Sequence, residues 1–458
     1  MNLNILVFSL LVPLVAGVVC YLVRVKRLRE ILSFGVSVLL FIVSIFLFIK
    51  TQKTSYYFVW PWLLDIDFSL RCGNFSSIFL IFISFLALLV SFYSWGFMRE
   101  GKRVGEYYTY LLFIMAVSWG TVMAGNIVVF LLFWGILGIL LYSFLSFGSH
   151  RLATKGMFTI GVGDFALILG ALFLFRLSGT LEIDSISGIS IKGALPLIIF
   201  ILLATGAIAK IGAIPFHTWI PDASEQIPAP VMAYLPASID KLVGVYLLFL
   251  VVSRFFTFTA LSFASLFLSI IAAFTLVVAV MMALISSDMR KVVAYLNISA
   301  AGYMVLGMAT ANAVGIAGRL FYLFGTVLWT SLLFFVTGEV EKKTGTCDLS
   351  LLRGLAKLMP SVFVGFLIGN LAISGIPPLN GFFSKWMIYQ GIIELGKLEG
   401  WGNLWIIWLS VAMFGSAVTL ASCMKMTYSA FLSHTDETGA GQKEPLLRGR
   451  DFTLKFPT

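Results

Sequence analysis

Charged residues are scarce in this sequence. Of its 458 residues, 11% are Asp, Glu, Lys or Arg, 60% are hydrophobic, and the mean hydropathy is +1.01. A water-soluble chain of this length needs far more surface charge, so the composition excludes a soluble globular protein. Long apolar runs continue from residue 3 to residue 432 and leave no room for a large soluble domain. The chain is therefore predicted to cross a membrane many times.

Cysteine is also scarce, and its distribution excludes a class of cofactor. The four cysteines are scattered and form no CxxC pair: Cys20, Cys72, Cys347 and Cys423. Clustered thiolates are the signature of iron–sulfur and structural metal sites. We therefore expect no metal, no cofactor and no catalytic centre in this chain, which then cannot easily carry electrons itself.

A cleavable leader is not indicated either. The first apolar run, 3–23, lacks a charged n-region and a small-residue cleavage site, so it is predicted to be the first membrane helix. The fold class is an all-α polytopic membrane protein with about thirteen spans, each near the ~20 residues that a bilayer requires. The predicted helices are 3–24, 30–50, 76–97, 106–123, 125–147, 156–177, 193–213, 229–253, 257–285, 290–310, 313–337, 359–396 and 402–432.

Basic residues divide unequally between the two ends of these helices. Of the 31 Lys and Arg residues, 19 fall on one face, including Arg24, Arg99, Lys102, Arg290 and the tail after residue 433. Eight fall on the other face, including Lys50, Arg71, Arg254 and Arg319, and four lysines lie inside spans. We expect the protein in the inner (plasma) membrane of the cell. The positive-inside rule then places the N-terminus outside and the polar tail, 433–458, in the cytoplasm. The asymmetry also explains the net charge of +10, so nucleic-acid binding is not needed.

Three lysines lie deep in apolar runs: Lys210, Lys241 and Lys385. A lysine at the centre of a membrane helix costs roughly 2.5–3.5 kcal/mol on insertion scales. Residues retained at such a cost commonly serve ion movement. A fourth span lysine, Lys425, is about two turns from a helix end, where its long stem can snorkel to the interface, and a role in a proton path is the alternative.

Glycine and proline interrupt two of the lysine-bearing helices. The seventh predicted helix contains Ile214–Pro215 after Lys210, and the twelfth contains Pro377 and Pro378 before Lys385. Proline strands a carbonyl one turn earlier, and in lipid that group needs protein or water as a partner. In the eighth helix Pro236 lies five residues before Lys241. Simple kinks are the alternative reading, but three breaks beside three lysines favour hydrated pockets.

The two broken helices occupy equivalent places in two units. Each is the fourth helix of a set of five, so the sequence predicts two inverted five-helix repeats, at 106–253 and 257–432, preceded by three helices in 1–105. Inverted repeats with broken helices are typical of ion-coupled transporters.

Several segments give the chain a specific resemblance. They are VGDFALILG (162–170), AKIGAIPFHTWIPDA (209–223), PASIDKLVGVYLL (236–248), SSDMRKVVAYLNISAAGYMVLGM (286–308), GTCDLSLLRGLAKLMP (345–360) and PLNGFFSKWMI (378–388). The chain resembles the antiporter-like membrane subunits shared by respiratory complex I, Mrp-type sodium/proton antiporters and energy-converting membrane-bound hydrogenases, with the hydrogenase type closest in the Asp240–Lys241 pair.

The resemblance implies roles for particular residues. Lys210 matches the family's pumping lysine, Lys241 a proton-relay residue and Lys385 the terminal lysine. Asp164 matches an aspartate of the sixth helix. Asp288 and Lys291 match an Asp-x-x-Lys turn, where a helix start and topology anchor is the simpler reading. His217, beside the first break, is a candidate proton-entry group or a hydrogen-bonded structural histidine.

Two departures from the family pattern concern the charge of these lysines. The family usually places a glutamate after a tryptophan of the fifth helix as the partner of the lysine at 210, and here Gly135 stands there. Thr326 and Thr330 replace a histidine and a lysine of the eleventh helix. Asp240 and Asp164 are the candidate substitute partners for Lys210, although adjacent helix residues point about 100° apart, which allows Asp240 and Lys241 to face different helices.

The resemblance implies translocation of protons or sodium ions by a subunit of a larger energy-converting oxidoreductase. Its partners would be other membrane subunits, both antiporter-like and small, and a peripheral redox arm with iron–sulfur clusters and a nickel–iron or quinone-reductase centre. One alternative is a subunit of a Mrp-type antiporter without redox partners. The other is a scaffold that conducts no ions, which Gly135, Thr326 and Thr330 favour and the three lysines oppose.

Overall fold

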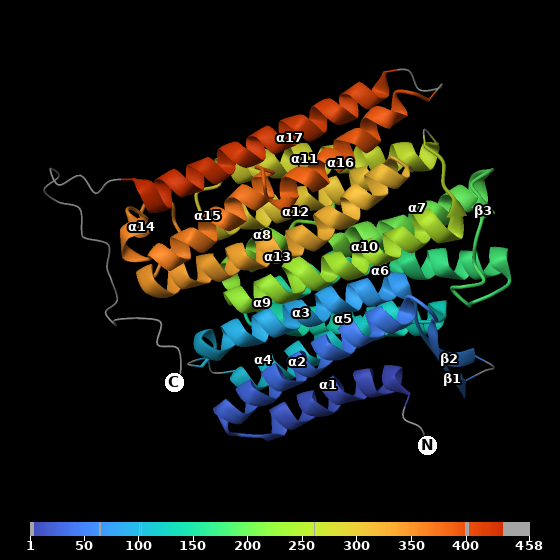
Figure 1. Ribbon diagram of the computed structural model, residues 1–458, viewed down its shortest axis with the longest axis horizontal. Helices are drawn as coiled ribbons and strands as arrows, with labels where there is room; N and C mark the ends of the chain where they lie inside the picture. Colours follow the sequence, from blue (N-terminus) through green and yellow to red (C-terminus); the bar gives the residue numbers. More distant parts are fainter. Residues whose placement is uncertain are drawn as a thin grey trace, which may run out of the picture.

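The protein is a bundle of long helices that run side by side along a common direction (Figure 1). The structure, a computed structural model, describes residues 4–63, 66–99, 101, 103–260, 262–398 and 403–433. The predicted polar tail lies outside the described residues from position 434 onward, as does Lys102. Apolar composition over whole helix lengths explains why helices dominate, because every backbone group is then satisfied inside its own segment.

The first half of the bundle contains helices joined by short connections and one hairpin. Its elements are α1 (Ile5–Leu22), α2 (Lys26–Thr51), β1 (Tyr56–Leu63), β2 (Ile66–Cys72), α3 (Asn74–Phe97), α4 (Val104–Met123), α5 (Ile127–Leu145), α6 (His150–Ser178), β3 (Ile189–Ser190), α7 (Ala194–Ile211), α8 (Trp219–Gln226), α9 (Ala229–Tyr234), a π-helical turn (Leu235–Ile239) and α10 (Asp240–Leu250).

The second half repeats this helical character. Its elements are a π-helical turn (Val251–Phe255), β4 (Phe256–Thr257), α11 (Phe263–Ile285), α12 (Met289–Ala309), α13 (Ala313–Thr344), α14 (Leu355–Leu358), α15 (Pro360–Ser374), α16 (Asn380–Leu395), α17 (Leu404–Met426) and a last π-helical turn (Thr427–Leu432).

Among the described residues, eleven helices are long and apolar enough to cross a membrane. The polytopic helical fold is confirmed, whereas the predicted number of thirteen spans is not. α4 is not among the eleven, and the predicted span 359–396 divides into the shorter helices α15 and α16. The domain limits and the inverted repeat stay predictions.

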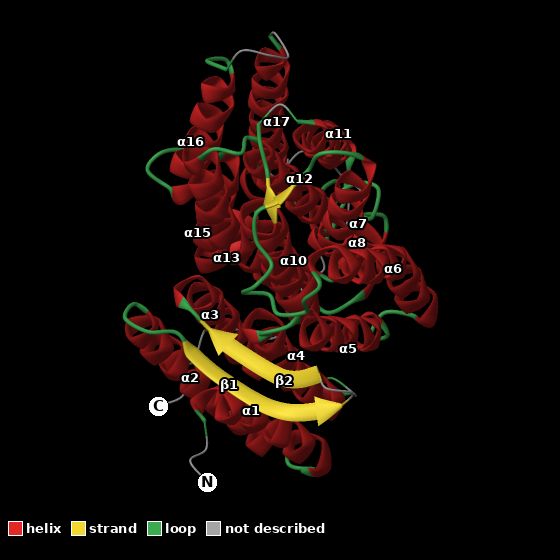
Figure 2. Cartoon of the chain, turned by 90° about the vertical axis from the view of Figure 1, so that its right-hand side faces the viewer, coloured by secondary structure: helices red, strands yellow, loops and turns green. Residues whose placement is uncertain are grey.

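An antiparallel hairpin of β1 and β2 adds to the predicted helical fold, pairing Tyr56 with Cys72 and Trp60 with Phe68. The segment is rich in aromatic and β-branched residues, which favour strands over helices. It crosses one end of the bundle beside α1 (Figure 2). We call this end the hairpin face and the opposite end, with Arg103 and Arg290, the basic face. On the hairpin face, Trp60 is exposed, as is common for aromatic residues at a membrane boundary.

Two helical segments form the centre of the bundle. The segment from Ala229 to Phe255 and helix α12 are each 94% buried over their apolar window, whereas the Leu404–Leu432 segment at the edge is only 17% buried. A segment enclosed by protein on all sides can carry polar groups away from lipid. The central segment from Ala229 to Phe255 carries Asp240 and Lys241, both fully buried.

One position assigned to a loop from sequence was placed wrongly. Arg319, counted among the basic residues of the hairpin face, lies inside α13 with no exposed surface. Its place near the helix start made a loop position reasonable, but the second turn of α13 is covered by α12, where Gly307 approaches Arg319 closely.

Candidate functional site

Two helices end at a glycine inside the bundle, as the predicted breaks require. α7 ends at Gly212 (φ 78°) and α15 ends at Gly375 (φ 83°), both in the left-handed region that glycine adopts without cost. Pro215 follows the first glycine, while Pro377 and Pro378 follow the second. The chain then resumes in α8 and in α16, so both predicted breaks are confirmed.

The break of α7 receives an ammonium group from the neighbouring helix. α7 and α10 meet at Gly244, where a Cβ would approach the Ala207 carbonyl oxygen to 3.0 Å. This close packing brings Lys241, one turn away on α10, into contact with the C-terminal end of α7. The Nζ of Lys241 donates to the Ile211 carbonyl oxygen at 3.0 Å. A cation at a helix C-terminus satisfies an orphan carbonyl and complements the helix dipole.

The second break is arranged in the same way. The Nζ of Lys385 on α16 donates to the carbonyl oxygens of Ile373 at 2.9 Å and Ser374 at 3.2 Å, the last two residues of α15. It also donates to the Ser416 hydroxyl at 3.2 Å. Each break therefore holds a buried lysine on the carbonyl end of its first half-helix.

Lys210 has a carboxylate partner despite Gly135. Its Nζ lies 3.6 Å from Oδ1 of Asp240, and both side chains are essentially without exposed surface. The separation is that of an ion pair slightly longer than a hydrogen bond. Asp240 was one of two candidate partners in the sequence, and the structure places it there. Asp240 and Lys241 both face α7, because they contact its successive residues Lys210 and Ile211.

Asp164, the other candidate, reaches the same region through a tryptophan. Trp134 Nε1 donates to Oδ1 of Asp164 at 2.6 Å, and the Lys210 ammonium lies 5.3 Å from the centre of the Trp134 ring. An aromatic face at this distance attracts a cation. Trp134 was not a predicted site residue. Its place directly before Gly135, in the family's Trp–Glu position, was the signal.

Gly135, the residue after Trp134, has open space in front of its Cα. A Cβ added there would meet no heavy atom within 4 Å, and the residue is exposed on the surface of α5. The position therefore has room for a larger side chain.

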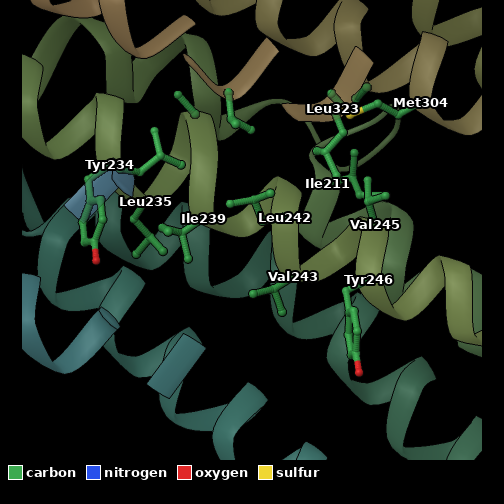
Figure 3. Close-up of a cluster of buried hydrophobic side chains, with 14 of the residues drawn as sticks. Ile211, Tyr234, Leu235, Ile239, Leu242, Val243, Val245, Tyr246, Met304 and Leu323 are labelled. Atoms are coloured by element: carbon green, nitrogen blue, oxygen red, sulfur yellow. The ribbon is translucent and has the colours of Figure 1, made fainter. Parts of the chain in front are cut away.

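A wall of apolar side chains separates the first break from the hairpin-face side of the bundle. Figure 3 shows Ile211 beside Val245, with Met304 and Leu323 close by, while Tyr246 points to the other side of its helix. All five are buried. Such packing excludes water between the break and its surroundings and strengthens the electrostatic interactions enclosed by it.

Three other predicted site residues interact mainly with the helix ends and turns next to them. Pro236 lies in the π-helical turn Leu235–Ile239, so the expected irregularity of this helix is present. His217 is half-buried in the turn after Pro215, and its Nδ1 is buried without a hydrogen-bond partner among the described residues. Lys425 donates to the carbonyl oxygens of Leu284 and Ser286 at 2.8 Å, at the end of α11.

The Asp-x-x-Lys turn is a helix start, as its simpler reading predicts. Asp288 caps α12 by accepting from the backbone amides of Arg290 and Lys291. The side chain of Lys291 pairs with Glu225 at 2.8 Å, and Arg290 pairs with Glu341 at 2.7 Å. These pairs tie the basic-face ends of three helices together.

The threonines of the eleventh predicted helix contribute no charge to the site. Thr326 and Thr330 are buried in α13, and the Thr330 hydroxyl donates to the Thr326 carbonyl oxygen at 2.7 Å within the same helix. The region between the two lysine sites therefore contains hydroxyls at positions where the family has titratable groups.

Sequence comparison identifies the family. Residues 124–417 match the family described as NADH:quinone oxidoreductase/Mrp antiporter, TM, and residues 62–108 match the N-terminus of chain 5 of NADH-ubiquinone oxidoreductase (complex I). The subunit 5 of the chloroplast NAD(P)H-quinone oxidoreductase of Ipomoea purpurea is 30% identical over 411 residues, which cover 82% of this chain and 57% of that protein. The chain thus spans little more than half the length of this relative.

Solved structures share the fold. A chain of the Mrp complex from Dietzia sp. DQ12-45-1b superposes with a TM-score of 0.84 at 22% identity, covering 95% of this chain and 81% of the other. A chain of the membrane-bound sulfane sulfur reductase, an archaeal respiratory membrane complex, superposes with a TM-score of 0.83 at 24% identity, covering 94% and 71%. With the matched residues, the two helix breaks and their lysines, these findings show that the chain belongs to the NADH:quinone oxidoreductase/Mrp antiporter transmembrane family.

Proposed function

We propose that this chain is an ion-translocating membrane subunit of a multi-subunit energy-converting complex. The observation that supports it most strongly is the buried Lys210–Asp240 pair beside a broken helix, with a second buried lysine at an equivalent break. A buried ammonium readily loses its proton, and a nearby carboxylate favours the charged form. Movement of Asp240 relative to Lys210 therefore changes how strongly the positive charge of the lysine is stabilised.

The route proposed for the ion connects the two breaks through the centre of the bundle. Lys210 exchanges charge with Asp240, the adjacent Lys241 lies at the carbonyl end of α7, and Lys385 is the terminal group. Protons are the ion that titrating lysines handle directly, and sodium is the alternative cargo. The proposed orientation has the basic face, and with it the tail, in the cytoplasm of a plasma membrane.

The proposed partners are other membrane subunits and a peripheral redox arm. Because this chain has no clustered cysteines, electron transfer would depend on iron–sulfur or nickel–iron centres in those partners. Two related assemblies support this: complex I, whose subunit 5 is similar in sequence, and the sulfane sulfur reductase complex, which is similar in fold.

A Mrp-type antiporter without a redox arm is the second candidate, and the similarity in fold to a chain of the Mrp complex favours it. Purification of the intact complex through a tag on this chain distinguishes the two. Co-purifying proteins with iron–sulfur absorbance support the redox complex, and their absence from an active complex supports the antiporter.

The proposed function is tested by ion transport in liposomes that contain the intact purified complex. Lys210→Ala and Lys385→Ala are each expected to abolish most transport per electron, or per exchanged ion in an antiporter. Lys192→Ala, which removes an exposed lysine of the hairpin face, is the matched control. Full transport in both buried-lysine variants would show that the chain is a scaffold.

A further inference from the structure

Among the described residues, one buried cation has neither a charge partner nor a hydrogen-bond partner. Arg319 has no exposed surface, and none of its three side-chain nitrogens has a hydrogen-bond partner among the described residues. No salt bridge includes it in the described part of the chain. An unpaired buried charge costs several kcal/mol, on the order of 3–5 where one partner of a pair is removed. Such a residue has a use that outweighs this cost.

Arg319 lies next to the terminal lysine site on one side. It is three residues before Tyr322 on α13, so the two side chains share one face of the helix. The Lys385 ammonium lies 6.0 Å from the centre of the Tyr322 ring. One helical turn toward the hairpin face therefore separates the ring beside Lys385 from Arg319.

On its other side Arg319 contacts an aromatic ring that borders a cavity. Its guanidinium carbon lies 5.5 Å from the centre of the Phe249 ring. Phe249 stacks on Phe75 with ring centres 3.9 Å apart, and both rings line the cavity. The two rings thus form a wall of this cavity beside Arg319.

The cavity lies at the hairpin face and has a volume of about 400 Å³. That is room for several water molecules. Its lining includes Asp184, which forms salt bridges with both Arg71 and Arg254. The hydroxyls of Ser76 and Tyr246, 3.1 Å apart, add further polar groups. A polar cavity of this size at the end of a membrane bundle is suited to hold water.

We propose that this cavity is the hairpin-face vestibule of the ion route and that Arg319 is the positive charge that opposes passive cation leak between the vestibule and Lys385. The proposal rests on the proposed function. Two like charges repel strongly inside a protein of low dielectric constant. Arginine side chains provide such electrostatic barriers to protons and cations in other membrane pores. The ring of Phe249 forms the steric part of the same barrier, because it lies beside Arg319 and lines the cavity.

The test measures passive proton leak in liposomes that contain the intact complex. A potassium diffusion potential with valinomycin drives protons, an entrapped pH dye reports them, and no electron donor is added. We expect Arg319→Gln to raise the leak about tenfold or more, because the electrostatic barrier is lost. Arg319→Lys keeps the charge and is expected to leak like the unmodified complex. Arg176→Gln, which removes an exposed arginine near the same face, is the matched control.

The result that overturns the proposal is an assembled Arg319→Gln complex with unchanged leak, or an Arg319→Lys complex that leaks as much as Arg319→Gln. If Arg319→Gln does not assemble, Arg319→Met decides: it removes the charge, has a similar length and suits the apolar surroundings, and an unchanged leak in that variant contradicts the barrier. Because the leak is measured without a driving reaction, it can fail or succeed independently of the Lys385→Ala transport test.

Discussion

The two helix breaks share a backbone design and differ in charge. In each, a half-helix ends at a left-handed glycine and a buried lysine donates to its last carbonyl groups. At the α7 break a carboxylate is present, because Asp240 pairs with Lys210. At the α15 break the described residues give Lys385 only carbonyls, the Ser416 hydroxyl and the faces of two tyrosines.

This difference indicates a division of roles between the two sites. A lysine with a carboxylate partner can be held charged or released as the partner moves. A lysine with neutral partners depends on the desolvation of its own charge and responds to any positive charge brought near it. We infer that the α7 site controls ion movement through its carboxylate, and that Lys385 at the α15 site responds to the charge brought near it.

Removal of the carboxylate is expected to have the largest effect. Asp240→Asn leaves the Lys210 ammonium buried and uncompensated, a cost of about 3–5 kcal/mol. The charge of Lys210 then has no partner to exchange with, so transport is expected to fall roughly tenfold or more. Ion transport in liposomes measures this. Glu106→Gln, which neutralises a surface carboxylate paired with Arg103, is the control, and equal losses in the two variants would contradict a specific role for Asp240.

The vacant family position provides a rescue for the same variant. A side chain at Gly135 meets no atom within 4 Å of its Cβ, so Gly135→Glu is sterically possible. Combined with Asp240→Asn, it is expected to recover part of the transport, because it returns a carboxylate to the family position directly after Trp134, whose ring centre lies 5.3 Å from the Lys210 ammonium. Gly135→Gln in the same background provides the neutral control. Equal recovery with glutamine would mean that packing, and not charge, is restored.

A carboxylate added to the second break is expected to have an intermediate effect. Ser416→Asp places a negative group where a hydroxyl now lies 3.2 Å from the Lys385 ammonium. A fixed carboxylate there stabilises the positive charge of Lys385, so transport is expected to fall about threefold to tenfold, which corresponds to roughly 0.7–1.4 kcal/mol. Ser416→Asn, which has the same shape without the charge, should transport normally. Normal transport with aspartate would remove the proposed difference between the two breaks.

The sequence predicted the breaks and the buried lysines well because both are local. A glycine followed by proline ends a helix whatever surrounds it, and a lysine far from any charged loop is buried in any membrane fold. The partner of Lys210 could only be narrowed to two candidates, because the pairing depends on how α7 and α10 meet at Gly244. Arg319 was misplaced for the same reason: its distance from the helix start suggested water, and only the packing of α12 removes it.

The smallest effect on transport is expected at Lys425, whose ammonium contacts a helix end instead of another charged group. Its ammonium binds two carbonyls at the end of α11, which is the position where a cation stabilises a helix. Lys425→Gln should lower the free energy of unfolding by about 0.5–1 kcal/mol and leave ion transport unchanged. Thermal unfolding of the purified complex and transport in liposomes measure the two quantities, with Lys192→Gln as the exposed control. A loss of transport as large as in Asp240→Asn would instead place Lys425 on the ion route, and the route would then extend past the α15 break toward the basic face.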